Sequence, residues 1–446
     1  MSNVILFMSD EHSYSYSSVY GNPLISTPNM EMLANNGTVY KNAYCPSPLC
    51  APSRSAVMSG KRVFQIQVYN NCILNLKTDY PSYGEMLSRQ GIYTVYAGKC
   101  DVYNSAENLG FSELIMAKDR NPPGDTNFTR RPFAIRMNAA KRAGHGVKED
   151  AFINDNKTID AAIEWIASKG ALLEQPWVLV INALKPHFPQ YVTQKYWDMY
   201  PVVDMPQYGS ECESAAHPYA GDLRRHFETD LFTKEQTIGL RRGYLGCITY
   251  VDEQIGRIMD TLKETGLIED TNFIYTSDHG DMMGKFGMWW KCSLYEDSIR
   301  VPCIAAGPDF EKGKIVETPV DLLDVQASIF KAVGAQRPED WVGEPLQEIQ
   351  KNNKDRVVFS EYHGHGTRSG AFMVRKGDWK LIYYMEAPNQ LFNLADDPNE
   401  LNNLYERFPK KGKELEEELR LICSPEKENE RAHQFEAEQN KLLDRF

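Results

Sequence analysis

Short, continuous apolar runs alternate with longer amphipathic segments along most of the chain. A continuous apolar run of about five residues is typical of a strand that is covered on both faces. In the clearest amphipathic segment, apolar residues recur every three or four positions from Tyr244 to Leu262, and Gly266 stands just beyond, which predicts a helix that ends there. Alternating strands and helices predict a mostly parallel sheet with helices on both faces. The predicted strands lie at 4–8, 93–97, 177–181, 273–276 and 302–306.

The pattern changes after about residue 350. Three short runs at 357–360, 372–375 and 379–384 are typical of antiparallel strands, and the charged segments 411–423 and 427–443 are typical of helices packed on such a sheet. We therefore predict a catalytic α/β domain over 1–350 and a C-terminal subdomain over 351–446 with a small antiparallel sheet and helices. Two segments rich in polar, Gly or Pro residues, 118–150 and 204–224, are expected to be long surface loops beside a site.

Composition narrows the class of protein. The 446 residues are 42% hydrophobic and 25% charged, as in ordinary soluble globular proteins, and suffice for one large domain with an appendage or for two or three domains. The formal net charge of -12 argues against nucleic acid as a partner. It also means that an anionic substrate would need a local cationic pocket.

The cysteines and the N-terminal segment indicate the cellular compartment in which the protein is expected. Nine cysteines without tight spacing do not form a disulfide framework, and we expect most of them to be core residues in a reducing environment. The first apolar run is too short for a signal peptide, and no stretch approaches the length of a membrane span. We expect a cytoplasmic chain with no membrane partner, or a periplasmic or secreted one if a leader has been removed.

Ionisable residues follow the C-terminal ends of four predicted strands. In open α/β sheets, ligands bind beyond the carboxyl ends of the strands. Any one such residue is more often a solvated or hydrogen-bonded surface group, but charge at four strand ends on one edge predicts a functional site there. The residues are Asp10, Glu11 and His12; Lys99; Lys185 and His187; and Asp278, His279 and Asp281.

Several of these strand-end residues are suited to a metal. Asp10, Glu11 and Asp278 are hard oxygen donors, and with a neutral His279 they suit Ca²⁺, or alternatively Mg²⁺. Zinc is disfavoured because no Cys/His pair has zinc-finger spacing. A divalent cation would also keep the crowded carboxylates ionised.

A second chemical signal is the run Cys50-Ala51-Pro52-Ser53-Arg54. A Cys before Pro-Ser is usually a small buried apolar residue, and so short a pattern also occurs by chance. Pro52, however, suits the first turn of a helix, which would place Cys50 at a helix N-terminus that favours an anion. Arg54, one turn further on, adds a fixed positive charge.

This run resembles the core signature of the formylglycine-dependent sulfatases, in the alkaline phosphatase-like superfamily. The residues from 47 to 54 are most similar to those of choline-sulfatase-like and of uronate- or hexosamine-sulfatase-like members. Two positions depart from the family pattern: Glu11 stands where Asp or Gln is usual, and Asp101 where His is common. Further stretches similar to the family follow in order at 3–11, 27–30, 58–61, 98–99, 185–189, 275–281, 287–291 and 391–400.

The resemblance implies a fold and an activity. The fold is a large, mixed, mostly parallel sheet sandwiched by helices, with a smaller C-terminal α+β subdomain. The activity is hydrolysis of a sulfate monoester, here of a small sulfated carbohydrate such as a uronate or hexosamine. Cys50 would be oxidised to formylglycine (3-oxoalanine) by a formylglycine-generating or anaerobic sulfatase-maturating enzyme, and the hydrated aldehyde would attack sulfur.

The resemblance also implies roles for single residues. Lys99 and Lys291 would bind the sulfate, His187 would contact the ester oxygen, and Arg54 would orient the hydrated aldehyde. The expected metal ligands are Asp10, Glu11, Cys50, Asp278 and His279.

Other substrate contacts and functions stay open. The segment 361–368 is either a Gly-rich turn between strands or a loop that reaches the substrate. Rival functions are a choline-sulfate or aryl sulfatase, a phosphonate monoester or phosphodiester hydrolase, and a non-catalytic sulfo-ligand binder; an oligomer is also possible. The candidate substrate contacts are Asn71, Asp101, His363, His365 and Arg368.

Overall fold

The computed structural model describes residues 1–201 and 211–445. Its centre is an eight-stranded sheet of order β12-β2-β11-β9-β1-β7-β4-β5, in which the five strands from β9 to β5 are parallel. The predicted mixed, mostly parallel sheet is confirmed, although the strand predicted at 302–306 runs antiparallel to both of its neighbours. The strands are β1 (Asn3–Asp10), β2 (Gly37–Tyr40), β4 (Tyr93–Lys99), β5 (Glu113–Lys118), β7 (Trp177–Pro186), β9 (Thr271–Ser277), β11 (Cys303–Ala306) and β12 (Lys314–Val316).

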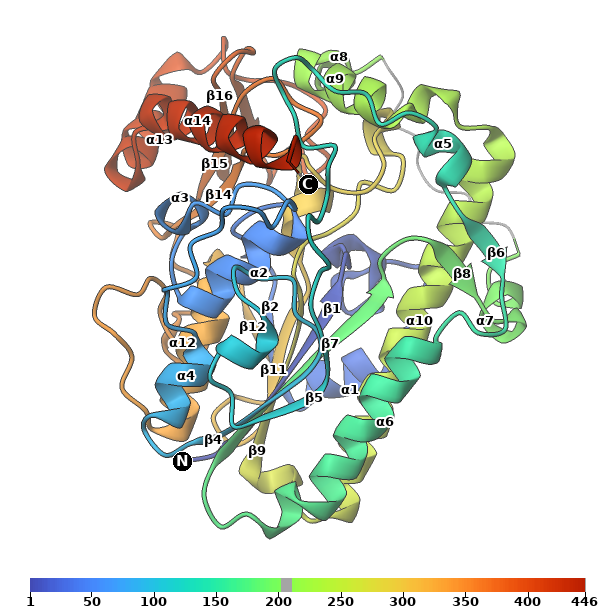
Figure 1. Ribbon diagram of the computed structural model, residues 1–446, viewed down its shortest axis with the longest axis vertical. Helices are drawn as coiled ribbons and strands as arrows, with labels where there is room; N and C mark the ends of the chain where they lie inside the picture. Colours follow the sequence, from blue (N-terminus) through green and yellow to red (C-terminus); the bar gives the residue numbers. More distant parts are fainter. Residues whose placement is uncertain (202–210, 446) are drawn as a thin grey trace.

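Helices cover both faces of this sheet (Figure 1). One layer holds α1 (Pro28–Asn35), α6 (Ile153–Ser168) and α10 (Lys234–Glu264), and the other holds α2 (Cys50–Ser59), α4 (Tyr83–Ser88) and α12 (Leu322–Val333). The stripe predicted between Tyr244 and Leu262 is the buried face of α10. This helix begins at a Thr233 capping box, and Gly266 adopts a positive φ of 74° just past its end.

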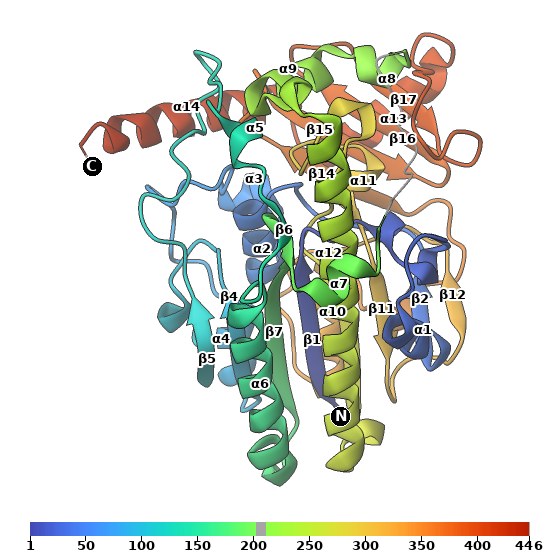
Figure 2. The same ribbon diagram turned by 90° about the vertical axis from the view of Figure 1, so that its right-hand side faces the viewer.

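A separate antiparallel sheet follows in the order β14-β15-β16-β17, as predicted for the C-terminal part. Its strands are β14 (Val357–Tyr362), β15 (Ala371–Lys376), β16 (Trp379–Tyr384) and β17 (Gln390–Asn393), of which only β17 was not predicted. Two helices pack beside it, α13 (Pro409–Ile422) and α14 (Pro425–Leu443). Figure 2 shows α14 running over the top of the main part, where Glu436 accepts a 2.7 Å hydrogen bond from Arg130.

Short elements complete the chain. The predicted loop at 118–150 is mostly irregular. The loop prediction at 204–224 is wrong over its last part, because helices α8 (Glu213–Ala216) and α9 (Pro218–Phe227) lie there. Residues 202–210 are outside the described part. Tyr219, Leu223 and Phe227 recur every four residues and are buried, a helical signal that the prediction overlooked. The short elements are β3 (Ala43–Tyr44), β6 (His145–Val147), β8 (Gln190–Val192), β10 (Arg300–Val301), β13 (Val320–Asp321), α3 (Val63–Ile66), α5 (Ala139–Arg142), α7 (Gln194–Asp198), α8 (Glu213–Ala216), α9 (Pro218–Phe227) and α11 (Glu296–Ile299).

Eight of the nine cysteines are buried, and Cys212 is partly exposed. Across the described residues, the helices are too short or too polar to cross a bilayer.

Candidate active site

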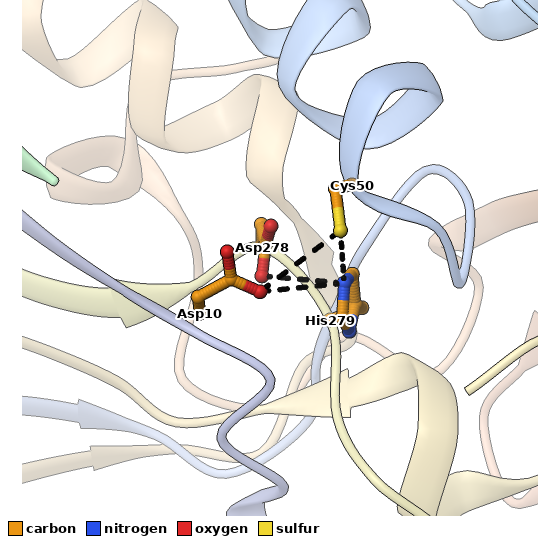
Figure 3. Close-up of side chains that lie close together, drawn as sticks. All are labelled: Asp10, Cys50, Asp278 and His279. Atoms are coloured by element: carbon orange, nitrogen blue, oxygen red, sulfur yellow. Dashed lines mark hydrogen bonds and ion pairs between the residues drawn. The ribbon is translucent and has the colours of Figure 1, made fainter. Parts of the chain in front are cut away.

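Two neighbouring strands and one helix N-terminus converge at the carboxyl edge of the large sheet. Asp10 is the last residue of β1, and Asp278 and His279 directly follow β9, which pairs with β1. Cys50 is the first residue of α2. Parallel strands end at the same edge, which is why residues far apart in sequence meet there. All four side chains are buried and face one another (Figure 3).

The four side chains fit a divalent metal. Nε2 of His279 lies 3.3 Å from Sγ of Cys50, 3.6 Å from Oδ1 of Asp278 and 3.8 Å from Oδ1 of Asp10. One ligand atom from each of the four lies within 4.8 Å of the others. Two carboxylates and an imidazole around one buried point form a donor set for a hard cation that tolerates nitrogen.

Arg54 holds the two carboxylates of this cluster in place. It lies one helical turn after Cys50, and its Nε donates to Oδ2 of Asp278 at 2.7 Å. Its other nitrogens donate to Asn182 at 2.9 Å and to Asp10 at 3.4 Å. These charge-assisted bonds of a fully buried guanidinium fix the orientation of both carboxylates.

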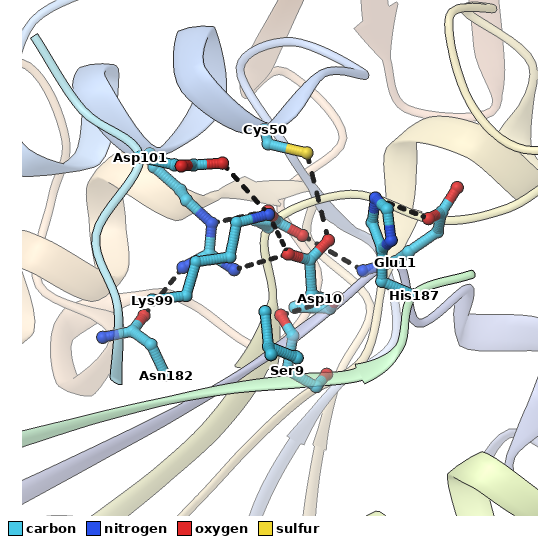
Figure 4. A network of polar contacts seen from close by, with 12 residues as sticks. Ser9, Asp10, Glu11, Cys50, Lys99, Asp101, Asn182 and His187 are labelled. Carbon is cyan, nitrogen blue, oxygen red and sulfur yellow. Dashed lines mark hydrogen bonds and ion pairs between the residues drawn. The ribbon is translucent and has the colours of Figure 1, made fainter. Parts of the chain in front are cut away.

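Two lysines bring positive charge to the position of Cys50. The ammonium of Lys99 contacts Asp10 and lies 3.2 Å from Asp101 (Figure 4). The ammonium of Lys291 lies 3.1 Å from Glu11. Burial alone would raise the pKa of the Cys50 thiol, but the ammonium groups of Lys291 and Lys99 hold it well below its usual value. The same competition between burial and Lys99 leaves the pKa of Asp10 lowered. The site therefore stabilises negative charge at residue 50.

Glu11 and His187 lie beside Asp10, and the Glu11 N–H donates to Oδ1 of Asp278 at 3.1 Å. His187 follows β7, and its Nε2 is 3.4 Å from the same Glu11 oxygen that contacts Lys291. Glu11 lies outside the four-residue cluster, but with Asp10 and His187 it forms a second group whose ligand atoms lie within 4.8 Å of one another and could also hold a metal ion. Burial raises the pKa of Glu11 well above its usual value, against the opposing effect of Lys291.

The site opens into a cavity of about 570 Å³. Asn71, Asp101 and His365, three of the predicted substrate contacts, line it. Asn71 also accepts the Ala51 N–H at 3.0 Å, which fixes the start of α2. The volume falls in the range of ordinary small-molecule sites.

The other two predicted substrate contacts lie elsewhere. His363 is buried and pairs with Glu361 at 2.8 Å. Arg368 is exposed and donates to Asp222 at 2.8 and 3.0 Å. Neither lines the cavity.

Several residues of the site were not predicted. Asn182 anchors Arg54, and Arg120 and Arg136 of the 118–150 segment line the cavity. Asp155 of α6 accepts the N–H groups of Leu184 and Lys185 at 2.8 and 2.9 Å, just before His187. Only Asn182 had a signal in the sequence that could have identified it: it is a polar residue that directly follows the apolar run 177–181.

Comparison with known proteins gives a family for most of the chain. Residues 2–335 match the family model described as Sulfatase, and residues 284–424 match the one described as N-sulphoglucosamine sulphohydrolase, C-terminal. A choline-sulfatase of Rhizobium meliloti (strain 1021) is 30% identical over 407 residues, which cover 86% of this chain and 78% of that protein. Arylsulfatase K of Homo sapiens is 27% identical over 465 residues, which cover 98% of this chain and 85% of the relative.

Solved structures share the fold. A protein in complex with its substrate D-glucosamine-2-N,6-O-disulfate aligns with a TM-score of 0.75 at 20% identity, over 96% of this chain and 98% of that one. The phosphonate monoester hydrolase SpPMH from Silicibacter pomeroyi also aligns with a TM-score of 0.75, at 22% identity, over 95% of this chain and 94% of that one.

Proposed function

The chain belongs to the sulfatase family and is a sulfuric ester hydrolase, and we propose that it cleaves the sulfate monoester of a small carbohydrate, a uronate or hexosamine, with a formylglycine formed from Cys50. The observation that carries this proposal is the buried cluster of Asp10, Cys50, Asp278 and His279, flanked by Lys99 and Lys291. Lys99, Lys291 and the cation that this cluster would hold would together place positive charge around a bound sulfate.

The metal and the modified residue supply the reactive groups. Asp10, Asp278, His279 and residue 50 would hold a divalent cation, Ca²⁺ or alternatively Mg²⁺, which neutralises charge on the transferring sulfuryl oxygens. Formylglycine at residue 50 would supply, as its hydrated aldehyde, a nucleophilic hydroxyl for sulfur and a second hydroxyl that allows the sulfate to leave. An unmodified Cys50 has no second hydroxyl, so turnover depends on a maturation enzyme that provides the oxidant.

The chain's own side chains would bind the sulfate ester and donate a proton to its leaving oxygen. Lys99 and Lys291 bind the sulfate oxygens and stabilise the negative charge that develops on them in the transition state. Such electrostatic stabilisation is usually the largest contribution to rate acceleration. Arg54 orients residue 50 and the carboxylates of Asp10 and Asp278 relative to one another. As the bond from sulfur to the leaving oxygen breaks, that oxygen keeps the electron pair and takes a proton from His187 or Lys291.

The polar side chains that line the cavity favour a sugar rather than choline as the leaving group. Arg120 donates to Asp101, and Arg136 donates to Asp125 at 2.6 Å, so donors and acceptors for hydroxyl or carboxylate groups stand side by side. A trimethylammonium group would instead seek aromatic faces.

Two of the three Phe and Trp rings that line the cavity have cations next to them; the third ring is that of Trp290. Lys291 lies 5.1 Å from the ring centroid of Phe188, and Arg136 lies 5.7 Å from that of Phe227. Choline would compete with these cations at Phe188 and Phe227, which favours the carbohydrate at those two rings.

Mass spectrometry and mutagenesis test the proposal. Peptide mass spectrometry of active protein should show loss of the Cys50 sulfur, and Cys50→Ala should abolish turnover while circular dichroism stays unchanged. Initial rates on sulfated uronates, sulfated hexosamines, choline sulfate, an aryl sulfate and an aryl phosphonate monoester should rank a sugar sulfate first. Full activity of Cys50→Ala would refute the formylglycine mechanism, and a preference for choline sulfate or the phosphonate would refute the substrate class.

A further inference from the structure

Gln439, near the C-terminal end of α14, has a fully buried side chain that makes three hydrogen bonds to one distant segment, 70–74. Its Oε1 accepts the side-chain N–H of Asn70 at 2.8 Å. Its Nε2 donates to the carbonyl oxygens of Cys72 at 3.1 Å and Leu74 at 2.9 Å. A buried amide is costly unless it is hydrogen-bonded, so these three bonds fix the segment against the helix.

The segment 70–74 reaches the start of α2 through Asn71. Oδ1 of Asn71 accepts the N–H of Ala51, the second residue of this helix, at 3.0 Å. The N-cap residue of α2 is Leu49, which has no side-chain oxygen to accept such a bond. Asn71 therefore supplies, from another part of the chain, the cap that α2 lacks, directly beside residue 50.

The same segment is joined to the wall of the cavity. The Asp125 N–H donates to the carbonyl oxygen of Asn71 at 3.0 Å, and the Ile73 N–H donates to that of Pro123 at 3.0 Å. Asn71 and Asp125 both line the cavity. A shift of the segment 70–74 would thus move the start of α2 and part of the cavity wall together.

We propose that Gln439 is a positioning residue for sulfate ester hydrolysis: from α14 it holds the segment 70–74 so that Asn71 fixes the start of α2 and residue 50. The assignment rests on the proposed function, because it acts through the nucleophile formed at residue 50. Gln439 does not itself line the cavity, so its effect on the reaction is indirect. The C-terminal helix, which lies above α2 in both views (Figures 1 and 2), thereby helps to order the active site.

The test compares Gln439→Met with Gln434→Met, the same change at an earlier position of the same helix. Methionine is close to glutamine in size but has no amide, so Gln439→Met leaves the Asn70 amide and two carbonyl groups without these partners. Gln434 is exposed, and its amide donates to Glu430 of α14 itself at 2.9 Å. Each protein is matured in the same way, and its rates are normalised to its formylglycine content, from mass spectrometry, and to its metal content, from elemental analysis.

The first readout is kcat on 4-nitrophenyl sulfate, or on the sugar sulfate that the wild type hydrolyses best. For Gln439→Met, kcat should fall about 10-fold, because a slightly misplaced nucleophile reaches the productive geometry less often. For Gln434→Met, kcat should equal that of the wild type.

The second readout is the coupling between Gln439 and Asn71. Gln439→Met added to Asn71→Ala should lower kcat by less than about two-fold further, because Asn71 is the route by which Gln439 acts. If Gln439 contributed only to stability, its variant would lower the Tm, and its loss of kcat would not depend on Asn71. If Gln439→Met does not fold, Gln439→Asn, which keeps a buried amide that is one methylene shorter, is measured by the same criteria.

Three outcomes would overturn the assignment: a wild-type kcat in folded Gln439→Met, an equal loss in Gln434→Met, or losses that multiply in the double variant. Any of these in an enzyme whose wild type is active, and whose Cys50→Ala variant is not, would overturn this assignment alone. If matured wild-type protein hydrolysed no sulfate ester, or if Cys50→Ala were fully active, the proposed function would fail as well.

Discussion

Lys380 of β16 offers a quantitative test of how the C-terminal sheet is joined to the catalytic part. It is fully buried, and its ammonium donates to Glu296 at 2.9 Å and to Glu400 at 2.7 Å. Glu296 opens α11, five residues after the candidate catalytic Lys291. The change Lys380→Met keeps the length of the side chain but leaves two buried carboxylates without their shared cation.

The expected cost follows from the burial of the three groups. Removal of one partner from a buried ion pair costs about 3–5 kcal/mol, because the remaining charge stays desolvated. Glu296 keeps the Tyr44 hydroxyl at 2.9 Å and Arg300 at 3.3 Å. Most of the cost therefore falls on Glu400, for which Lys380 is the strongest cationic neighbour.

Lys376→Met is the matched control. Lys376 ends the neighbouring strand β15 and pairs with Glu418 at 2.6 Å, but both side chains are about one quarter exposed (25% and 24%). A solvated pair of this kind contributes about 0–1 kcal/mol. Urea unfolding followed by circular dichroism should thus show a loss of unfolding free energy several times larger for Lys380→Met than for Lys376→Met.

The same pair predicts how the difference varies with pH. Burial raises the pKa of Glu400 above its usual 4.5, even though Lys380 opposes the shift. A carboxyl with a raised folded pKa binds its proton more tightly in the folded state, so its contribution to stability falls as pH rises above 4.5. Loss of Lys380 raises that pKa further, so the cost of Lys380→Met should grow from pH 5 to pH 8. A cost equal to that of Lys376→Met at pH 8, or one that shrinks as pH rises, would refute the reasoning.

Three further predictions concern the site itself. Arg54→Lys cannot reproduce the fork to Asp278 and Asn182, so kcat on an aryl sulfate should fall about 100-fold; near-normal kcat would contradict this role. Asp155→Ala removes both acceptors behind the His187 segment and should lower kcat on a sugar sulfate about 10-fold with metal content unchanged, and an unaltered kcat would count against it. Prolonged chelation should abolish turnover and lower the Tm, with recovery on adding Ca²⁺ or Mg²⁺; full activity of verified metal-free protein would exclude the metal.

Hydrophobic patterning was sufficient to predict the layers of the fold. The continuous runs that became β1, β7 and β9 are buried on both faces, and such strands leave little ambiguity in sequence. It was also sufficient to place Asp10 and Asp278 at one edge, because parallel neighbours end together. The reversed direction of β11 was not visible, since an apolar run of four residues has no polarity along the chain.

The partners of individual charged groups could not be predicted in the same way. Arg368 and His365 are three residues apart in sequence, yet one pairs with Asp222 at the surface and the other lines the cavity. Their directions depend on the turn between β14 and β15 and on the packing of α9 against it. The contact of Glu11 with Lys291 has the same origin, because it depends on a backbone φ of 72° that the sequence position beside Asp10 does not reveal.

The overall charge of the chain and the charge of its site have opposite consequences for a sulfate ester. A formal charge of -12 repels an anion at long range, but exposed charges are screened beyond about 8 Å at physiological ionic strength. The side chains of Lys99 and Lys291 are only 10% and 6% exposed and lie at the cavity wall, so they would interact with a ligand there with little screening. The lysines proposed to bind sulfate are thus shielded from water and paired with the carboxylates of Asp10 and Glu11, which accounts for acidic side chains around a site for an anion.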